Sequence, residues 1–422
     1  MRLFAGLFIL ASSIFLIHYF FSGEAVYGDG IDYWVHLRSI YFDHDLDFTN
    51  EYKHIFSPEN NNSNNEIVSP FVLKTSLTST GKADNPHTGG TASLLWPFFG
   101  AADVAILAGL NGIRNGYSDI YQISVGLGSV ILGIAGVFVG SLLAIKTGVK
   151  RSWARWGAAG IFLGSPLLYY GSYDVINSHT AIFLAVSLFW YILFFSKNKA
   201  NKRLVFLGAL AGLAASIRMQ EGLLLIFGIF WLIGNKTERR ADISFLMSGF
   251  LIVFWPVLYQ WKYLYGVWWP QTYLASGHIF RGWTGSLLHG TNGLFSRTPA
   301  LFLILIKLPQ LIVKKREVRY LTLYFLAQML VITWQGGWRD AAYGARMYIS
   351  SLPLFTILLA AFLQILTKYM GGKTAILVVL VFALTNLLSI GSFIFKEKEV
   401  NSGNKRGLEE HALDRLEKLL GR

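Results

Sequence analysis

The chain of 422 residues contains no cysteine. This absence excludes disulfide scaffolds, zinc-thiolate sites, iron–sulfur clusters and cysteine nucleophiles. Charged residues are also scarce: they make up 14% of the chain, against roughly 25% in soluble globular proteins, whereas 53% of the residues are hydrophobic. Because so few charges are available to cover a surface in water, most of the surface must face lipid. The composition therefore predicts a polytopic membrane protein.

Long apolar stretches define the expected membrane spans. The first runs from residue 3 to about 21 behind the single cation Arg2, and no small-residue cleavage site follows it, so we expect an uncleaved helix rather than a signal peptide. Further stretches bring the expected total to about eleven helices: 119–145, 154–171, 180–195, 204–217, 222–234, 243–265, 298–313, 320–335, 347–367 and 374–395. The predicted fold class is an all-α integral membrane protein, with a membrane module over 1–395 and a charged amphipathic tail over 396–422.

The distribution of positive charge predicts the orientation. With the N-terminus inside, Arg2 and alternate loops together account for eighteen of the 37 Lys and Arg residues, which favours a cytoplasmic position for these loops. This parity requires that the stretch 94–113, with its Pro97, Asp103 and several glycines, forms an interfacial or re-entrant helix. Residues 23–118 then form one large extracytoplasmic loop, and together with Asp119 they contain twelve of the 24 acids. The net charge of +13 thus reflects the bias of a membrane protein and does not indicate nucleic-acid binding.

The densest polar group directly follows the first helix. Asp29 lies between two glycines, which leave its carboxylate uncrowded and the backbone free to turn. A second acidic cluster holds Asp43, Asp45 and Asp47 at alternating positions. This cluster fits the capping of helices or a calcium site, although the glycine and glutamate spacing of an EF-hand is absent.

Several arginines lie near the external ends of the predicted spans. An arginine at membrane depth costs about 3 kcal/mol and is usually placed for a partner. That partner can be an acid of the protein, such as Glu221 for Arg218 or Asp340 for Arg339, or it can be an anionic ligand, since arginine makes forked contacts with phosphate. We expect at least one of the four to bind an anionic group: Arg218, Arg297, Arg339 and Arg346.

Two further residues lie on the same predicted side. His179, in a polar loop between two spans, fits either helix capping or a direct contact with substrate. Trp338 fits the aromatic belt of a membrane protein, and an aromatic ring beside a polar pocket also suits stacking on a sugar.

In order and topology these features resemble the polytopic glycosyltransferases of the C superfamily (GT-C), which use polyprenyl-phosphate sugars and include protein O-mannosyltransferases and aminoarabinose transferases. Asp29-x-x-x-Tyr33 is similar to the family's Asp-Glu-x-x-Tyr motif after the first helix. Gly30 stands where the family has its second acid, so either Asp32 takes that place or the second carboxylate is dispensable. Other landmarks are spread over about residues 1–365: Asp45 to Tyr52, His87 to Gly90, Leu95 to Phe98, Ser178-His179, Gly293 to Ser296 and Gly337 to Arg346.

The resemblance implies an extracytoplasmic active site in the cell membrane, in which Asp29 is the general base and Asp32 a supporting carboxylate. The donor is then a polyprenyl-phosphate sugar, and the acceptor is a glycan, a lipid or a protein. A single displacement would invert the anomeric centre. The remaining expected site residues are Arg346, Arg218 and Arg297 at the donor phosphate, and Tyr33, His179, Asp45, Asp47 and Trp338 at the substrates.

We expect no essential metal, because arginines can stabilise a single departing phosphate; a divalent cation such as Mg²⁺ or Mn²⁺ is the alternative. The rival function is a transporter or flippase for a lipid-linked or anionic solute. Transporters usually contain internal repeats with paired broken helices near the midplane. This sequence shows no such repeat, and its polar residues gather on one predicted side, which favours the transferase.

Overall fold

The structure is a computed structural model that describes residues 1–23, 25–56, 77–196, 201–234, 240–270, 279–290, 292–339 and 342–397. Within these ranges the regular elements are helices, apart from one isolated bridge between Leu77 and Ala83. The all-α prediction is confirmed for this part of the chain. The tail over 398–422 lies outside the described residues, and the domain boundaries stay a prediction.

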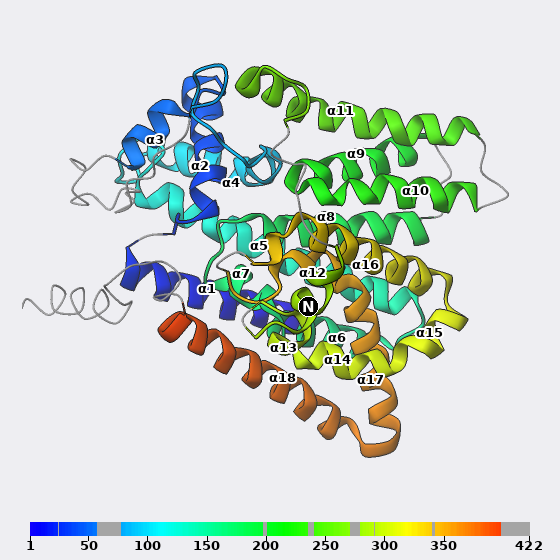
Figure 1. The fold of residues 1–422 in the computed structure, drawn as a ribbon. Helices are drawn as coiled ribbons and strands as arrows, with labels where there is room; N and C mark the ends of the chain where they lie inside the picture. Colours follow the sequence, from blue (N-terminus) through cyan, green and yellow to red (C-terminus); the bar gives the residue numbers. More distant parts are fainter. Residues whose placement is uncertain are drawn as a thin grey trace, which may run out of the picture.

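Long helices lie side by side in one bundle (Figure 1). The longer ones are α1 (Arg2–Ser22), α4 (Gly90–Leu107), α5 (Asp119–Lys146), α8 (Ser178–Phe195), α9 (Asn201–Ile217), α11 (Arg240–Tyr265), α16 (Arg316–Gln335), α17 (Leu352–Met370) and α18 (Gly372–Ser392). The shorter ones are α6 (Arg151–Leu163), α7 (Pro166–Ser172), α10 (Leu223–Ile233), α12 (Ile279–Leu288), α13 (Leu294–Arg297), α14 (Pro299–Ile304) and α15 (Leu308–Lys314). Each apolar stretch that the sequence singled out is largely helical, although 154–171 is divided between α6 and α7.

Seven described helices are long and apolar enough to cross a membrane: α1, α4, α5, α8, most of α11, α17 with the turn before it, and α18 with the turn after it. The expected count of about eleven is therefore not confirmed. The 3-10 turn Leu305–Lys307 and Pro309, the second residue of α15, divide the predicted span 298–313 into short helices. The helix α4, which we expected to lie at the interface, is among the seven, so the topology derived by parity stays a prediction.

The segment after α1 lies across one end of the bundle (Figure 1). It contains α2 (Asp29–Arg38), a π-type turn (Ser39–Asp43) and α3 (Thr49–Ile55). Gly23 ends α1 at φ 79°, and Gly28 precedes α2 at φ 55°, both left-handed conformations that favour glycine. The two acids of the first turn of α2, Asp29 and Asp32, are stabilised there by the helix N-terminus.

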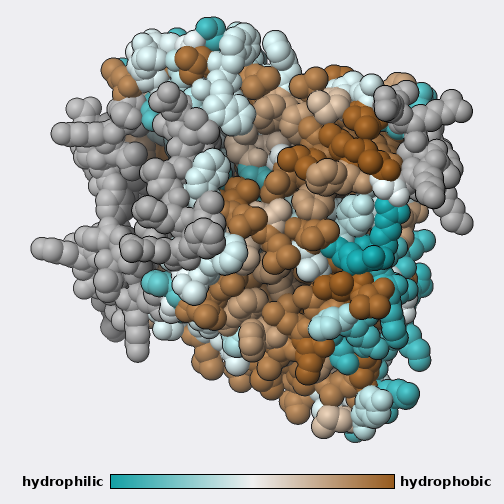
Figure 2. Space-filling model, turned by 45° about the vertical axis from the view of Figure 1, so that its right-hand side comes forward, coloured by the Kyte–Doolittle hydropathy of each residue, from teal (hydrophilic) through white to brown (hydrophobic). Residues whose placement is uncertain are grey.

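The cation-rich turns gather at the other end. The helix α5 begins beside the end of α1, where the Tyr19 hydroxyl donates to Asp119, and its 28 residues carry the chain roughly 42 Å to Lys146. Next to that turn a Cβ on Gly148 would lie 3.5 Å from the ammonium of Lys315. Figure 2 shows a broad hydrophobic flank that fits contact with lipid, with hydrophilic residues gathered along its right-hand edge. The cation-rich turns near Lys146 and Lys315 thus lie at the end of the bundle away from the acidic segment.

Candidate active site

The centre of the site is a contact between Asp29 and Arg346, which lie 317 residues apart in the chain. Nη1 of Arg346 donates to Oδ2 of Asp29 at 2.6 Å, from the turn Arg346–Ser351 that precedes α17. The Asp29 side chain keeps 40% of its surface exposed and that of Arg346 keeps 17%, so the pair opens to the outside. Partial burial acts to raise the pKa of Asp29, but the charges of Arg346 and His87 and the hydrogen bond from Arg346 outweigh it, and the pKa lies below its ordinary value. Asp29 is therefore a carboxylate at neutral pH.

A second guanidinium, that of Arg218, acts on the same carboxylate. Arg218 has extended backbone between α9 and the short turn Met219–Gly222, and its side chain is partly buried. Its Nη1 donates to Nδ1 of His179 at 3.0 Å, and its Nη2 contacts the sulfur of Met347. In the described part of the chain no carboxylate lies within ion-pair distance of Arg218. A partly buried cation without a counter-ion is a candidate anion-binding group.

The anticipated pairing of Arg218 with Glu221 is not formed, because Glu221 is saturated by other groups. Its Oε2 accepts hydrogen bonds from Nε2 of Gln328 at 2.8 Å and from the Tyr324 hydroxyl. Nε2 of Gln220 donates to Oε1 of Glu221 at 3.2 Å and to the backbone oxygen of Met347, also at 3.2 Å. This buried network ties the turn after Arg218 to α16 and to the residue that follows Arg346, and so it positions the two arginines relative to each other.

The supporting acid Asp32 lies one turn further along α2. The hydroxyl of Tyr52 donates to its Oδ1 at 2.6 Å, and its Oδ2 lies 3.6 Å from Nε2 of His87. Burial raises the pKa of Asp32, against the opposing effects of His87 and of the Tyr52 hydrogen bond, while the charge of Asp29 adds to the increase. The two carboxyl groups of α2 therefore have pKa values displaced in opposite directions, which is a frequent property of acid–base sites.

His87 is a site residue that sequence reasoning did not select, although it opens one of the motifs on which the resemblance rests. Its Nδ1 lies 3.2 Å from the Tyr33 hydroxyl, and its backbone N–H donates to Oδ1 of Asn85 at 2.9 Å. Its backbone oxygen accepts from Nε2 of Gln260 on α11 at 3.1 Å. The ring is thus held firmly but stays 29% exposed. Tyr33 is only 3% exposed, and its hydroxyl contacts the ring of His87.

Gly30 explains why this chain departs from the motif that it resembles. A Cβ at position 30 would lie 2.6 Å from the backbone oxygen of Ile176, just before α8. Any side chain there would push α2 away from the start of α8. The second acid of the motif is therefore excluded by packing at position 30, and Asp32 is the nearby carboxylate on the same helix.

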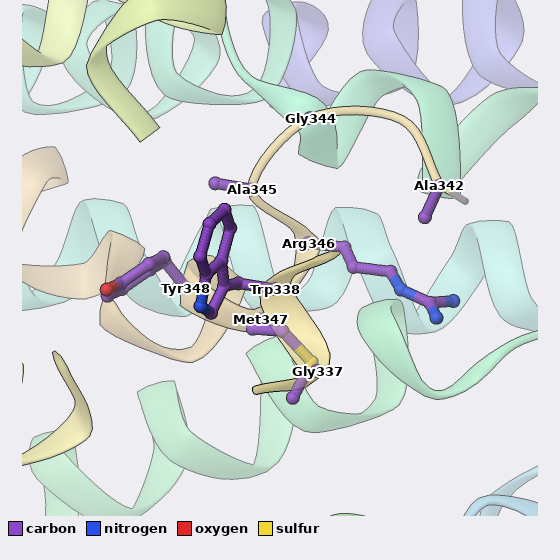
Figure 3. Close-up of a pocket in the computed structure, with 8 residues that line it drawn as sticks. All are labelled: Gly337, Trp338, Ala342, Gly344, Ala345, Arg346, Met347 and Tyr348. Carbon is purple, nitrogen blue, oxygen red and sulfur yellow. The ribbon is translucent and has the colours of Figure 1, made fainter. Parts of the chain in front are cut away.

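Trp338 lines a pocket together with Arg346, Met347 and Tyr348. Figure 3 shows Trp338 and Tyr348 on one side of the loop and the Arg346 side chain extending to the other. The ring of Trp338 lies edge to face with that of His289, with centroids 5.8 Å apart. Trp338 therefore borders the site by way of the loop that carries Arg346. Its role as a substrate contact stays a prediction, as does that of His179, which is 2% exposed.

Three predicted site residues have local partners away from the Asp29–Arg346 contact. Asp45 accepts from the Ser39 hydroxyl at 2.8 Å, and Asp47 accepts from the Thr49 hydroxyl at 2.6 Å, so both acids stabilise turns. Nη1 of Arg297 donates to the Ser389 hydroxyl of α18 at 3.2 Å. Among the described residues no cluster of three or more His, Asp or Glu could hold a metal ion. The side chain of Arg339, and Asp340, lie outside the described part.

Residues 123–261 match a family model described as dolichyl-phosphate-mannose-protein mannosyltransferase. The match runs from α5 into α11 and includes His179 and Arg218, whereas Asp29 and Arg346 lie outside it. No curated protein and no solved structure matches the chain. Together with its apolar helices, the match indicates a multi-pass membrane glycosyltransferase of the kind that uses polyprenyl-phosphate sugars. The resemblance seen in the sequence is thus supported over residues 123–261, about a third of the chain, which are similar to this family.

Proposed function

We propose that this protein transfers a sugar from a polyprenyl-phosphate donor to a glycan, lipid or protein acceptor on the extracytoplasmic side of the cell membrane. One observation carries the proposal: a carboxylate and two guanidiniums, one of them without a carboxylate partner among the described residues, converge at one end of the bundle. A base for the acceptor and cations for the leaving phosphate are the two requirements of this chemistry.

The proposed reaction is a single displacement. The acceptor oxygen attacks the anomeric carbon while its proton passes to the Asp29 carboxylate. The bond between the anomeric carbon and the phosphate oxygen breaks, and its electron pair leaves with the polyprenyl phosphate. Arg346 and Arg218 stabilise the charge that develops on that phosphate. One displacement inverts the anomeric centre, and no second nucleophile is required.

Asp32 acts beside the base in this proposal. Its contacts to Tyr52 and His87 hold it on the same face of α2, where its charge raises the proton affinity of Asp29. Arg297 stays a proposed phosphate contact, because it lies near the loop that carries Arg346. Its Cβ would lie 3.8 Å from a Cβ on Gly344, in the loop that carries Arg346, whereas its Nη1 donates to Ser389. A divalent cation at the phosphate stays the alternative to a reaction without metal.

The distribution of charge supports the proposed sidedness. The proposed site lies at the end of the bundle that carries the acidic segment, and the cation-rich turns at 146–151 and 314–316 lie at the other end. Positive residues remain in the cytoplasm during insertion, which favours an extracytoplasmic position for Asp29.

The test uses purified protein in lipid vesicles with a radiolabelled polyprenyl-phosphate sugar and an extract of cell-envelope acceptors. Wild type is expected to move the label out of the donor lipid, and Asp29→Asn to lose this activity by about 1000-fold, at the upper part of the usual range for a general base. Asn50→Ala, an exposed change on α3, is the matched control and should retain the activity. Undiminished transfer by Asp29→Asn would remove Asp29 from the mechanism.

A further inference from the structure

Arg346 has two proposed partners, the Asp29 carboxylate and the donor phosphate. In the structure its Nη1 is 2.6 Å from the Asp29 carboxylate, and in the proposed reaction it binds the donor phosphate. We infer that Asp29 and the donor phosphate compete for Arg346, so that binding of the donor releases the base from its ion pair. This inference rests on the proposed function and adds to it a regulation of the same site.

The geometry favours exchange over a fixed structural ion pair. Nη1 of Arg346 donates to Asp29 at 2.6 Å, and the Asp29 side chain remains 40% exposed, so an incoming anion can reach the pair from the open side. A phosphate presents more acceptor oxygens than a carboxylate and suits the forked guanidinium. By contrast, Asp103 is 1% exposed and binds Arg114 through two contacts at 2.9 and 3.0 Å, as a structural pair does.

The contacts of Arg218 indicate which of the two arginines the donor phosphate meets first. Because it makes no ion pair within the described part of the chain, its charge is available to an arriving phosphate without displacement of an acid. Its sulfur contact is to Met347, the residue next to Arg346, so a phosphate held by Arg218 lies beside Arg346. The donor would therefore dock on Arg218 first and draw Arg346 from Asp29 second.

The consequence for the reaction is that the base is active only when the donor is present. A carboxylate bound to a guanidinium is a poor proton acceptor, and loss of that partner raises its proton affinity. The negative charge of the bound phosphate raises it further. The acceptor is therefore deprotonated after the donor has bound, and the reaction is ordered with the donor first.

The experiment measures the affinity of undecaprenyl monophosphate, without a sugar, for the full-length protein in lipid nanodiscs. Asp29→Asn should bind this lipid about tenfold more tightly than wild type, which corresponds to about 1.4 kcal/mol. Arg346→Gln should bind it about tenfold more weakly. The matched control is Asp32→Asn, which removes a carboxylate from the same helix. The described contacts of Asp32 are to Tyr52 and His87 and not to Arg346. The affinity of this variant for the lipid should therefore stay within about threefold of wild type.

The double variant separates competition from general electrostatics. If Asp29 acts through Arg346, the gain from Asp29→Asn disappears in the Arg346→Gln background. A gain that persists there, or an equal gain in Asp32→Asn, overturns the competition and leaves the proposed function intact. If neither Arg346→Gln nor Arg218→Gln weakens binding while both variants keep the melting temperature of wild type, the phosphate site itself fails, and the proposed function fails with it.

Discussion

Replacing Arg218 by methionine should weaken donor binding without lowering the stability of the protein. The side chain is a partly buried cation whose described partners are the ring of His179 and the sulfur of Met347. Such partners compensate a guanidinium poorly, which supports the proposed contact of Arg218 with an anionic ligand. Methionine keeps much of the volume and removes the charge.

Two energies of similar size oppose each other at Arg218. A cation at membrane depth costs about 3 kcal/mol, and a charge-assisted hydrogen bond such as that from Arg218 to His179 returns about 1.5–3 kcal/mol. The two nearly cancel, so Arg218→Met should leave the melting temperature within a few degrees of wild type or raise it. Loss of one charged contact to a phosphate, at about 1.5–3 kcal/mol, should weaken donor binding about 10- to 100-fold.

The assay follows tryptophan fluorescence on heating in detergent and donor binding on the same sample. Arg114→Met is the matched control, because Arg114 makes two contacts to the buried carboxylate of Asp103 and lies outside the proposed site. It should lower the melting temperature, since it leaves Asp103 without its cation, and should leave donor affinity unchanged. The reasoning is refuted if Arg218→Met melts as far below wild type as Arg114→Met does, or if it binds the donor normally.

The other predictions concern pH, packing and sidedness. In the proposed mechanism Asp29 acts in its ionised form, and its pKa is lowered, so kcat/KM should fall with decreasing pH only below the ordinary aspartate range. Arg346→Gln should move this acid limb of the pH profile to higher pH, and an unmoved limb would contradict the ion pair. Gly30→Glu, which restores the second acid of the motif, should reduce folded yield on size-exclusion chromatography and not raise activity; a well-folded, more active variant would refute the packing argument. The chain has no cysteine, so Lys53→Cys and Arg151→Cys can be labelled singly in intact cells with an impermeant maleimide; we expect label only at position 53, and label at 151 alone would reverse the orientation.

Much of the fold could be predicted from the sequence because the composition and the long apolar stretches depend on local residues. The stretch 298–313 shows where this reasoning fails. Its hydropathy suggested one span, but the 3-10 turn Leu305–Lys307 and Pro309 divide it into short helices. The reasoning also fails for 94–113, whose polar residues suggested an interfacial helix. Asp103 binds Arg114 and accepts hydrogen bonds from two tyrosines, so it does not interrupt α4.

The candidate site was predictable in part. Asp29 and Arg346 were both selected from their motifs, and the structure joins them across 317 residues. Their contact could not be foreseen, because it depends on how α2 lies across the end of the bundle. His87 was overlooked because a histidine in a loop has no periodicity, and its position depends on Gln260 of α11. Arg297 was selected on the same grounds as Arg346, but its side chain reaches Ser389, which the local sequence does not encode.

The most direct test of the central claim is a cryo-electron microscopy map of the full-length protein with a bound polyprenyl phosphate. The account predicts a phosphate within hydrogen-bond distance of both Arg218 and Arg346, with Arg346 withdrawn from Asp29 and the Asp29 carboxylate facing the position of the sugar. A phosphate bound at another place, with the contact between Asp29 and Arg346 intact, would contradict it.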